Sequence, residues 1–102
     1  MSTKTATLVT DARTAATRLR QLYRHGGGSM ATVRAEERHG CALRTALAAL
    51  VAAGRSDLAG LLEEEDKTAE RLDAAKLAGQ DRPELRARLL KTRKDLRAAL
   101  TA

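Results

Sequence analysis

The sequence predicts an all-α fold, a small antiparallel bundle of about four helices. Alanine, leucine and arginine dominate, and the chain has one aromatic residue and one proline. Such a composition favours helices, because a sheet needs more β-branched and aromatic side chains. Apolar residues recur at alternating steps of three and four positions, the spacing of a single helix face. Glycines and the proline separate these runs, where helices end and begin.

The first helix is expected from about residue 7 to residue 24. Its apolar residues form one stripe, and its arginines lie mostly off that stripe. Thr10 and Asp11 are good capping residues, so the helix could also begin later than the first leucine. The stripe consists of Leu8, Ala12, Ala15, Leu19 and Leu22.

A second helix is expected from about residue 31 to residue 53. Gly54 is well placed to end it in a left-handed conformation, which glycine adopts without steric cost. Val51 widens the apolar face. The stripe itself consists of Gly40, Leu43, Leu47 and Leu50.

Ser56 is the expected N-cap of a third helix, with Asp57 in its first turn, where a negative charge favours the helix dipole. Gly79 is expected to end this helix. The apolar face consists of Leu58, Leu61, Leu62, Ala69 and Leu72, and Leu77 would extend it by a further turn.

The last helix is expected to begin at Asp81-Arg82-Pro83-Glu84. Asp81 would be the cap, Pro83 would lie in the first turn, where its missing N–H costs nothing, and Glu84 would reach back to the cap. The apolar face consists of Leu85, Leu89, Thr92, Leu96 and Ala99.

Charge divides the chain into contrasting segments. The net charge of residues 1–25 is +4, whereas that of residues 57–81 is −5, within a total of +6. Exposed ion pairs each contribute under about 1 kcal/mol, so this contrast is expected to select which helix faces which more than to add stability.

The stretch Gly26-Gly27-Gly28-Ser29-Met30 is typical of a flexible linker followed by the start of a second reading frame. It predicts three parts: an amphipathic recognition helix (1–25), a Gly/Ser linker (26–29) and a three-helix binding protein (30–102). On this interpretation the chain is an engineered fusion of two proteins that bind each other. A natural loop within one protein is the alternative. A short tether raises the effective concentration to the millimolar range, and allows binding within one molecule or exchange between two.

The expected function is therefore protein–protein interaction, by a small helical regulator or adaptor that holds its partner's helix in an apolar groove. Leu8, Leu19, Leu22 and Tyr23 are expected to anchor that helix. The full set of expected partner-binding residues is Leu8, Ala12, Ala15, Leu19, Leu22, Tyr23, Leu43, Leu47, Leu50, Leu58, Leu62, Leu72, Leu85, Leu89 and Leu96.

Nucleic-acid binding by the last helix is the second hypothesis. A sequence pI near 10.2 favours it. The acidic third helix, the lack of a recognisable DNA-binding motif and the near lack of stacking aromatics count against it. The expected phosphate-contacting residues are Arg82, Arg86, Arg93, Lys94 and Arg97.

No enzyme, cofactor or metal is expected, because no nucleophile–base pair, phosphate loop or complete ligand set is present. Glu36 and His39 share a helix face, but the second motif of a carboxylate-bridged metal site is missing. His25 is expected at a helix end and Cys41 as a packed residue. With one cysteine and no long apolar run, the chain is expected to be a cytoplasmic protein without a membrane or a small-molecule ligand as partner.

Overall fold

The structure, a computed structural model, describes residues 3–102, and within that range the chain forms four α-helices joined by short connections. The all-α class predicted from the sequence is confirmed. The helices are α1 (Thr3–His25), α2 (Met30–Ala52), α3 (Ser56–Leu77) and α4 (Pro83–Thr101).

The first helix begins four residues earlier than the sequence predicted. Thr7 and Thr10 donate their hydroxyl hydrogen bonds to the carbonyl oxygens of Thr3 (3.0 Å) and Ala6 (3.1 Å). Threonine and aspartate compete with a helix when their side chains bond to non-helical backbone. Here the threonine hydroxyls are satisfied inside the helix, so the polar start of the chain continues the first helix instead of delaying it.

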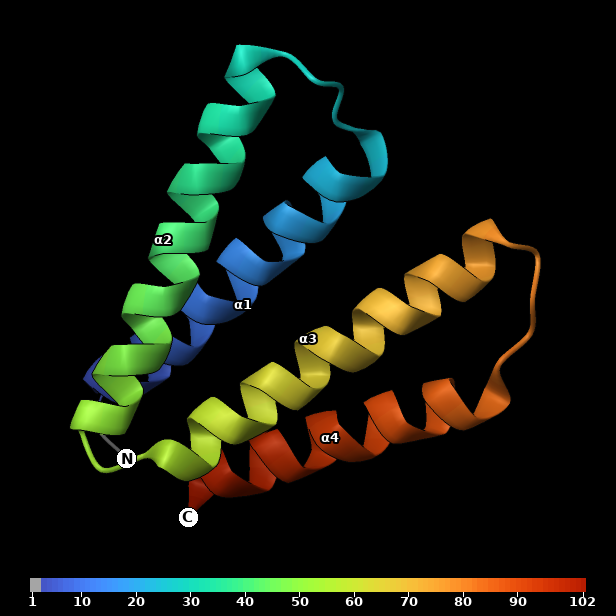
Figure 1. The fold of residues 1–102 in the computed structure, drawn as a ribbon. Coiled ribbons are helices and arrows are strands. Elements are labelled where there is room, and N and C mark those ends of the chain that lie inside the picture. The colour runs from blue at the N-terminus through green and yellow to red at the C-terminus, as the bar shows by residue number, and fades with distance from the viewer. Residues whose placement is uncertain (1–2) are drawn as a thin grey trace.

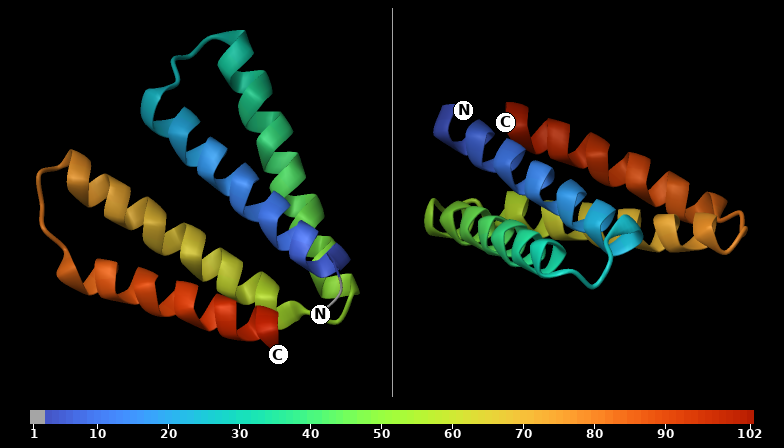
Figure 2. Two further views of the ribbon diagram at one scale, coloured as in Figure 1. Left: turned by 180° about the vertical axis from the view of Figure 1, so that it is seen from behind. Right: turned by 90° about the horizontal axis from the view of Figure 1, so that it is seen from above.

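The four helices form two antiparallel hairpins, α1–α2 and α3–α4, that meet at one end and diverge at the other (Figure 1). At the closed end α1 and α4 lie in one layer and α2 and α3 in the other (Figure 2). The Cα radius of gyration is 14.5 Å and the extents are 39 × 35 × 15 Å. A compact chain of this length has a radius of gyration of about 13 Å, so the open V makes the molecule broader than a compact bundle.

The main core lies at the closed end, where all four helices contribute side chains. A second, smaller cluster lies further out and joins α3 to α4 only. The expected bundle packing is therefore confined to the closed end. The main cluster consists of Val9, Ala12, Ala46, Leu50, Leu58, Ala59, Leu62 and Leu96, and the second of Ala69, Leu72, Leu85 and Leu89.

The glycines and the serine at the helix ends have defined roles. Gly54 (φ 77°) and Gly79 (φ 70°) adopt the left-handed conformation just past α2 and α3, as the sequence predicted. Ser29 caps α2, because its hydroxyl oxygen accepts the backbone N–H of Thr32 at 3.2 Å. The last residue of the expected linker thus fixes where α2 begins.

Two expected caps are wrong. Arg55, not Ser56, is the N-cap of α3, and Arg82, not Asp81, is the N-cap of α4; neither side chain makes a capping hydrogen bond. The expected cap Asp81 forms an ion pair with an arginine in the first turn of α4 instead. At Asp81, Arg86 competes with the backbone amides for the carboxylate.

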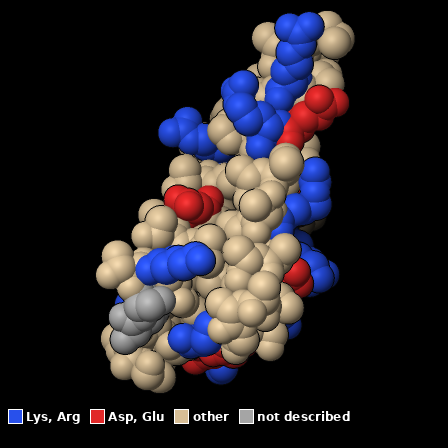
Figure 3. Space-filling view, turned by 90° about the vertical axis from the view of Figure 1, so that its left-hand side faces the viewer, with Lys and Arg blue, Asp and Glu red and all other residues tan. Residues whose placement is uncertain are grey.

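The outer surface has few acidic groups on the side formed by α2. In the space-filling view of that side, uncharged atoms predominate and basic residues outnumber acidic ones (Figure 3). α2 buries little, since only Ala46 and Leu50 are fully buried in it. None of the described helices combines the length and the apolar character that crossing a membrane requires.

Candidate interaction surface

The apolar stripe predicted for the first helix faces the rest of the chain. Ala12, Ala15 and Leu19 are buried, and Leu8 and Leu22 are half-buried. Ala12 belongs to the closed-end cluster, and Leu8 packs against it. The first helix therefore docks within its own molecule by the face that its spacing predicted.

Tyr23 does not act as an anchor, and the prediction for it is wrong. Its side chain is 65% exposed, beyond the last fully buried residue of α1. Tyr23 follows Leu19 by four positions, which places it about 40° around the helix from Leu19, but it lies one turn nearer the end of α1 and beyond the closed-end cluster. A large apolar side chain at a suitable helical angle is therefore not necessarily buried when it lies near the end of the helix.

The residues expected to receive α1 divide into two groups. Leu50, Leu58, Leu62 and Leu96 are buried in the closed-end cluster, where α1 also contributes. Leu43 and Leu47 are partly buried against the same cluster. The remaining residues of the expected set belong to the second cluster, which joins only the third and fourth helices: Leu72, Leu85 and Leu89.

Several buried residues were not predicted from the sequence. Val9 is 3% exposed and belongs to the core, and Ala16 is 6% exposed. Val9 lies three positions before Ala12 and Ala16 four positions after it. This helical spacing is the sequence signal that could have predicted their burial. Glu65 is also buried, although charged residues are rarely buried unless they are paired.

Beyond the core cluster, arginine–carboxylate pairs join α1 to α3. Arg13 donates two hydrogen bonds to Glu65, from Nε at 3.0 Å and from Nη2 at 2.7 Å. Further out, Arg20 pairs with Asp66 and also lies 4.0 Å from Asp73. Arg24, in the last turn of the helix, pairs with Asp73 as well. We call these contacts the arginine ladder; they place the basic first helix along the acidic third helix, as the charge pattern predicted.

Glu65 is the point where three helices meet. It accepts the bidentate bond from Arg13 of α1 and a third bond, at 3.1 Å, from Nε of Arg93 of α4. Its side chain is 9% exposed, whereas the two arginine side chains are each 40% exposed. Two partly solvated cations thus neutralise one buried carboxylate, an arrangement in which removing a partner leaves the carboxylate uncompensated.

The expected phosphate-contacting strip is largely occupied by carboxylates of the chain itself. Arg93 pairs with Glu65, and the other two pairs are Arg82 with Glu84 and Arg86 with Asp81. The hydrogen bond from Arg82 lowers the pKa of the Glu84 carboxyl below its usual value. Lys94 and Arg97 are exposed and have no acidic partner among the described residues.

The histidines, the cysteine and the acidic residues do not assemble a metal site in the described part of the chain, residues 3–102. Cys41, expected as a packed residue, is exposed instead, because its position on α2 faces away from α1. His39 is half-buried, and His25 is exposed at the end of α1.

Comparisons of this chain with protein-family models, with curated proteins and with solved structures gave no match.

Proposed function

We propose that this protein is a non-enzymatic helical interaction module, a small regulator or adaptor in which residues 30–102 hold the amphipathic helix supplied by residues 3–25. The arginine ladder is the observation that carries the proposal. Its pairs follow α1 from Arg13 to Arg24 and α3 from Glu65 to Asp73, so a helix with the wrong charge pattern would meet like charges along α3.

Apolar contacts supply affinity and the ladder supplies selectivity. Val9 and Ala12 fill the closed-end cluster, and burial of such side chains contributes about 25 cal/mol per Å² of apolar surface. Partly exposed ion pairs contribute under about 1 kcal/mol each, so they favour one orientation and one partner more than they tighten binding.

The proposal is tested by cutting the connection in the folded chain. Gly27 and Gly28 have open space around them, so a protease site can be inserted there without displacing a neighbour. After cleavage, the α1 fragment is expected to elute with residues 30–102 in gel filtration and to stay helical. Release of the fragment at micromolar concentration would contradict the proposal.

Variants of the cleaved protein separate the two contributions. Leu19→Asp buries a charge in an apolar contact and is expected to cost about 3 kcal/mol or more, a loss of over roughly 100-fold in affinity. Arg20→Gln is expected to cost about 1 kcal/mol. Lys4→Gln is the matched control for the arginine, because Lys4 is exposed and has no acidic partner in the described chain, and Tyr23→Ala is the apolar control.

We also propose that the chain consists of two polypeptides of separate origin, joined at Gly26–Met30. A four-residue connection spans at most about 14 Å, which suits antiparallel neighbours such as α1 and α2. A natural turn of one protein would use Gly26 and Ser29 in the same way. The two origins differ in one observable: joined polypeptides have separate genes, whereas a natural turn has a single gene that runs through it.

Nucleic-acid binding by α4 is the weaker proposal. Three of its five expected phosphate contacts already hold carboxylates, and a phosphate would have to displace them. An anisotropy titration of a labelled DNA duplex over a range of salt concentrations tests it. Binding through phosphates would weaken steeply with salt, with a slope set by the number of contacts.

A further inference from the structure

An open pocket of about 440 Å³ lies at the tip of the first hairpin, where α1 ends and α2 begins. Both histidines of the chain border it, although 14 positions separate them in the sequence. The remaining polar side chains of the lining are Arg18, Gln21 and Thr32. We call this the tip pocket.

The donors of the tip pocket are not committed to other groups. The side chains of Arg18, His25 and His39 form no hydrogen bond or ion pair with any other described residue, and neither does the side chain of Gln21. The contrast with the rest of α1 is clear, because Arg13, Arg20 and Arg24 each hold a carboxylate of α3. Arg18 lies on the opposite side of the helix from the arginine ladder.

The lining of the tip pocket contains no carboxylate. Four other hollows of the described surface each include at least one aspartate or glutamate. Arginine and amide side chains donate hydrogen bonds, and a histidine ring donates at least one in either protonation state. Arg18 and His39 also border a neighbouring hollow whose lining includes Asp11, but Asp11 forms no ion pair with either of them. A surface that offers several convergent donors, with no carboxylate in its own lining, is suited to an oxyanion.

The backbone around the pocket holds its walls close together. Gly26 donates its N–H to the carbonyl oxygen of Leu22 at 2.6 Å, and a Cβ added to Gly26 would lie 2.6 Å from Cγ2 of Thr32. Only glycine therefore lets the end of α1 approach the start of α2 this closely. The C-terminal dipole of α1 opposes an anion here and the N-terminal dipole of α2 favours one, so the side chains decide the preference.

From this geometry we propose that the tip pocket binds a phosphate-type oxyanion, with Arg18 as the charged ligand and His39 and His25 as flanking donors. The guanidinium can bind two oxygens of one phosphate in a planar fork, and the imidazoles approach from the α2 side and from the end of α1. The shared chemistry is a tetrahedral oxyanion, either free in solution or carried on a phosphorylated protein.

The intact chain itself reports on this site, because it contains only two histidines. The Cε1–H signals of His25 and His39 are followed by NMR during addition of sodium phosphate at constant pH. Sodium chloride is added to a second sample to the same ionic strength. The expected result is a saturable shift of both signals with phosphate and not with chloride. Equal shifts with the two salts would overturn the proposal.

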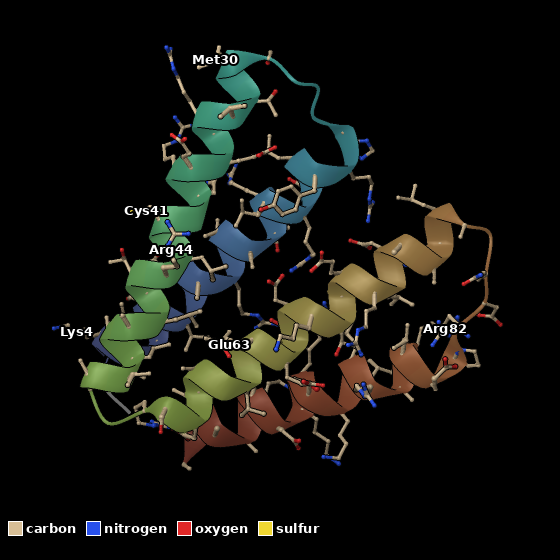
Figure 4. All side chains as sticks on the ribbon, in the orientation of Figure 1. Lys4, Met30, Cys41, Arg44, Glu63 and Arg82 are labelled. Carbon is tan, nitrogen blue, oxygen red and sulfur yellow. The ribbon has the colours of Figure 1, made fainter. Side chains whose placement is uncertain are left out.

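Two variants with a matched chemical change complete the test. Arg18→Gln is expected to weaken phosphate binding by roughly ten-fold or more, because it removes a charge-assisted bond. Arg44→Gln is the control: Arg44 is an exposed, unpaired arginine on the outer side of α2, away from the tip pocket (Figure 4). Equal loss in both variants would show general charge screening and overturn the proposal.

A phosphopeptide distinguishes the two sources of the oxyanion. The probe is a glycine pentapeptide with a central phosphoserine, and its unphosphorylated form is the control. Tighter binding than inorganic phosphate would identify a phosphorylated protein as the ligand, and equal binding would identify the free anion. Equal binding of both peptides, together with no saturation by phosphate, would exclude the site.

Discussion

At the residue scale, the three consecutive glycines are not equivalent. A Cβ at Gly26 would clash with Thr32 and, more closely still, with the carbonyl oxygen of Leu22, whereas Gly27 and Gly28 have open space around them. The sequence alone shows a uniform flexible stretch. The packing of two helix ends makes one of these positions a steric requirement and leaves the others free.

Gly26→Ala is expected to destabilise the fold by about 1–3 kcal/mol, because the backbone of the turn must move to admit the methyl group. Gly27→Ala is the matched control and is expected to be neutral or to stabilise by up to about 1 kcal/mol, since it restricts the unfolded chain. Urea unfolding followed by circular dichroism measures both. Equal free energies of unfolding for the two variants would contradict the steric account.

At the element scale, an arginine at the beginning of α3 forms hydrogen bonds with both α3 and α4. Arg55 binds Asp57 at 3.1 Å and 3.0 Å and also donates to the carbonyl oxygen of Ala99 at 2.9 Å, near the end of α4. The connection between the hairpins is thereby tied to α4. Its hydrogen bonds lower the pKa of the Asp57 carboxyl below its usual value.

Because the pKa of Asp57 is lower in the folded than in the unfolded chain, its contribution to stability is present above the unfolded pKa. The contribution is lost as the pH falls through the folded pKa. Arg55→Gln is expected to raise the pKa of Asp57 toward its usual value, as measured by NMR titration of the side-chain carboxyl. Glu84, which pairs with Arg82, is the internal control and should titrate unchanged. An unchanged Asp57 titration would show that the bond does not form in solution.

At the scale of the whole molecule, the two hairpins are held by different forces at different distances from the closed end. Apolar side chains of all four helices join them at that end. Further along α1 and α3, the arginine ladder spans the region where the ribbons diverge (Figure 1). The angle between the hairpins therefore depends on partly solvated charges. Salt screens the attraction between these charges, whereas it does not screen apolar contacts.

Raising sodium chloride to about 1 M shortens the screening length to about 3 Å and is expected to open the V. Small-angle scattering should then show a larger radius of gyration, while the helical circular dichroism stays constant. The Arg20→Gln variant is expected to show the wider form already at low salt. A radius of gyration that is independent of salt would show that packing alone sets the angle.

The local elements followed from the sequence because their causes are local. The three- and four-residue spacing, the left-handed glycines and the charge contrast between the first and third helices each predicted a feature that the structure has. Predictions of the burial or capping role of a single side chain were less accurate, because they depend on its neighbours in space. Tyr23 is exposed, and the expected caps Ser56 and Asp81 do not cap, because their surroundings come from other turns and other helices.

The sequence by itself determined four amphipathic helices and which of them attract each other, since period and charge are properties of the chain. Only the tertiary structure decided that the helices pack as two hairpins that share a core at one end. It also decided that Glu65 is buried between two arginines and that the two histidines border one pocket. These features depend on helix crossing angles and on the order of packing, and many arrangements bury the same apolar stripes equally well.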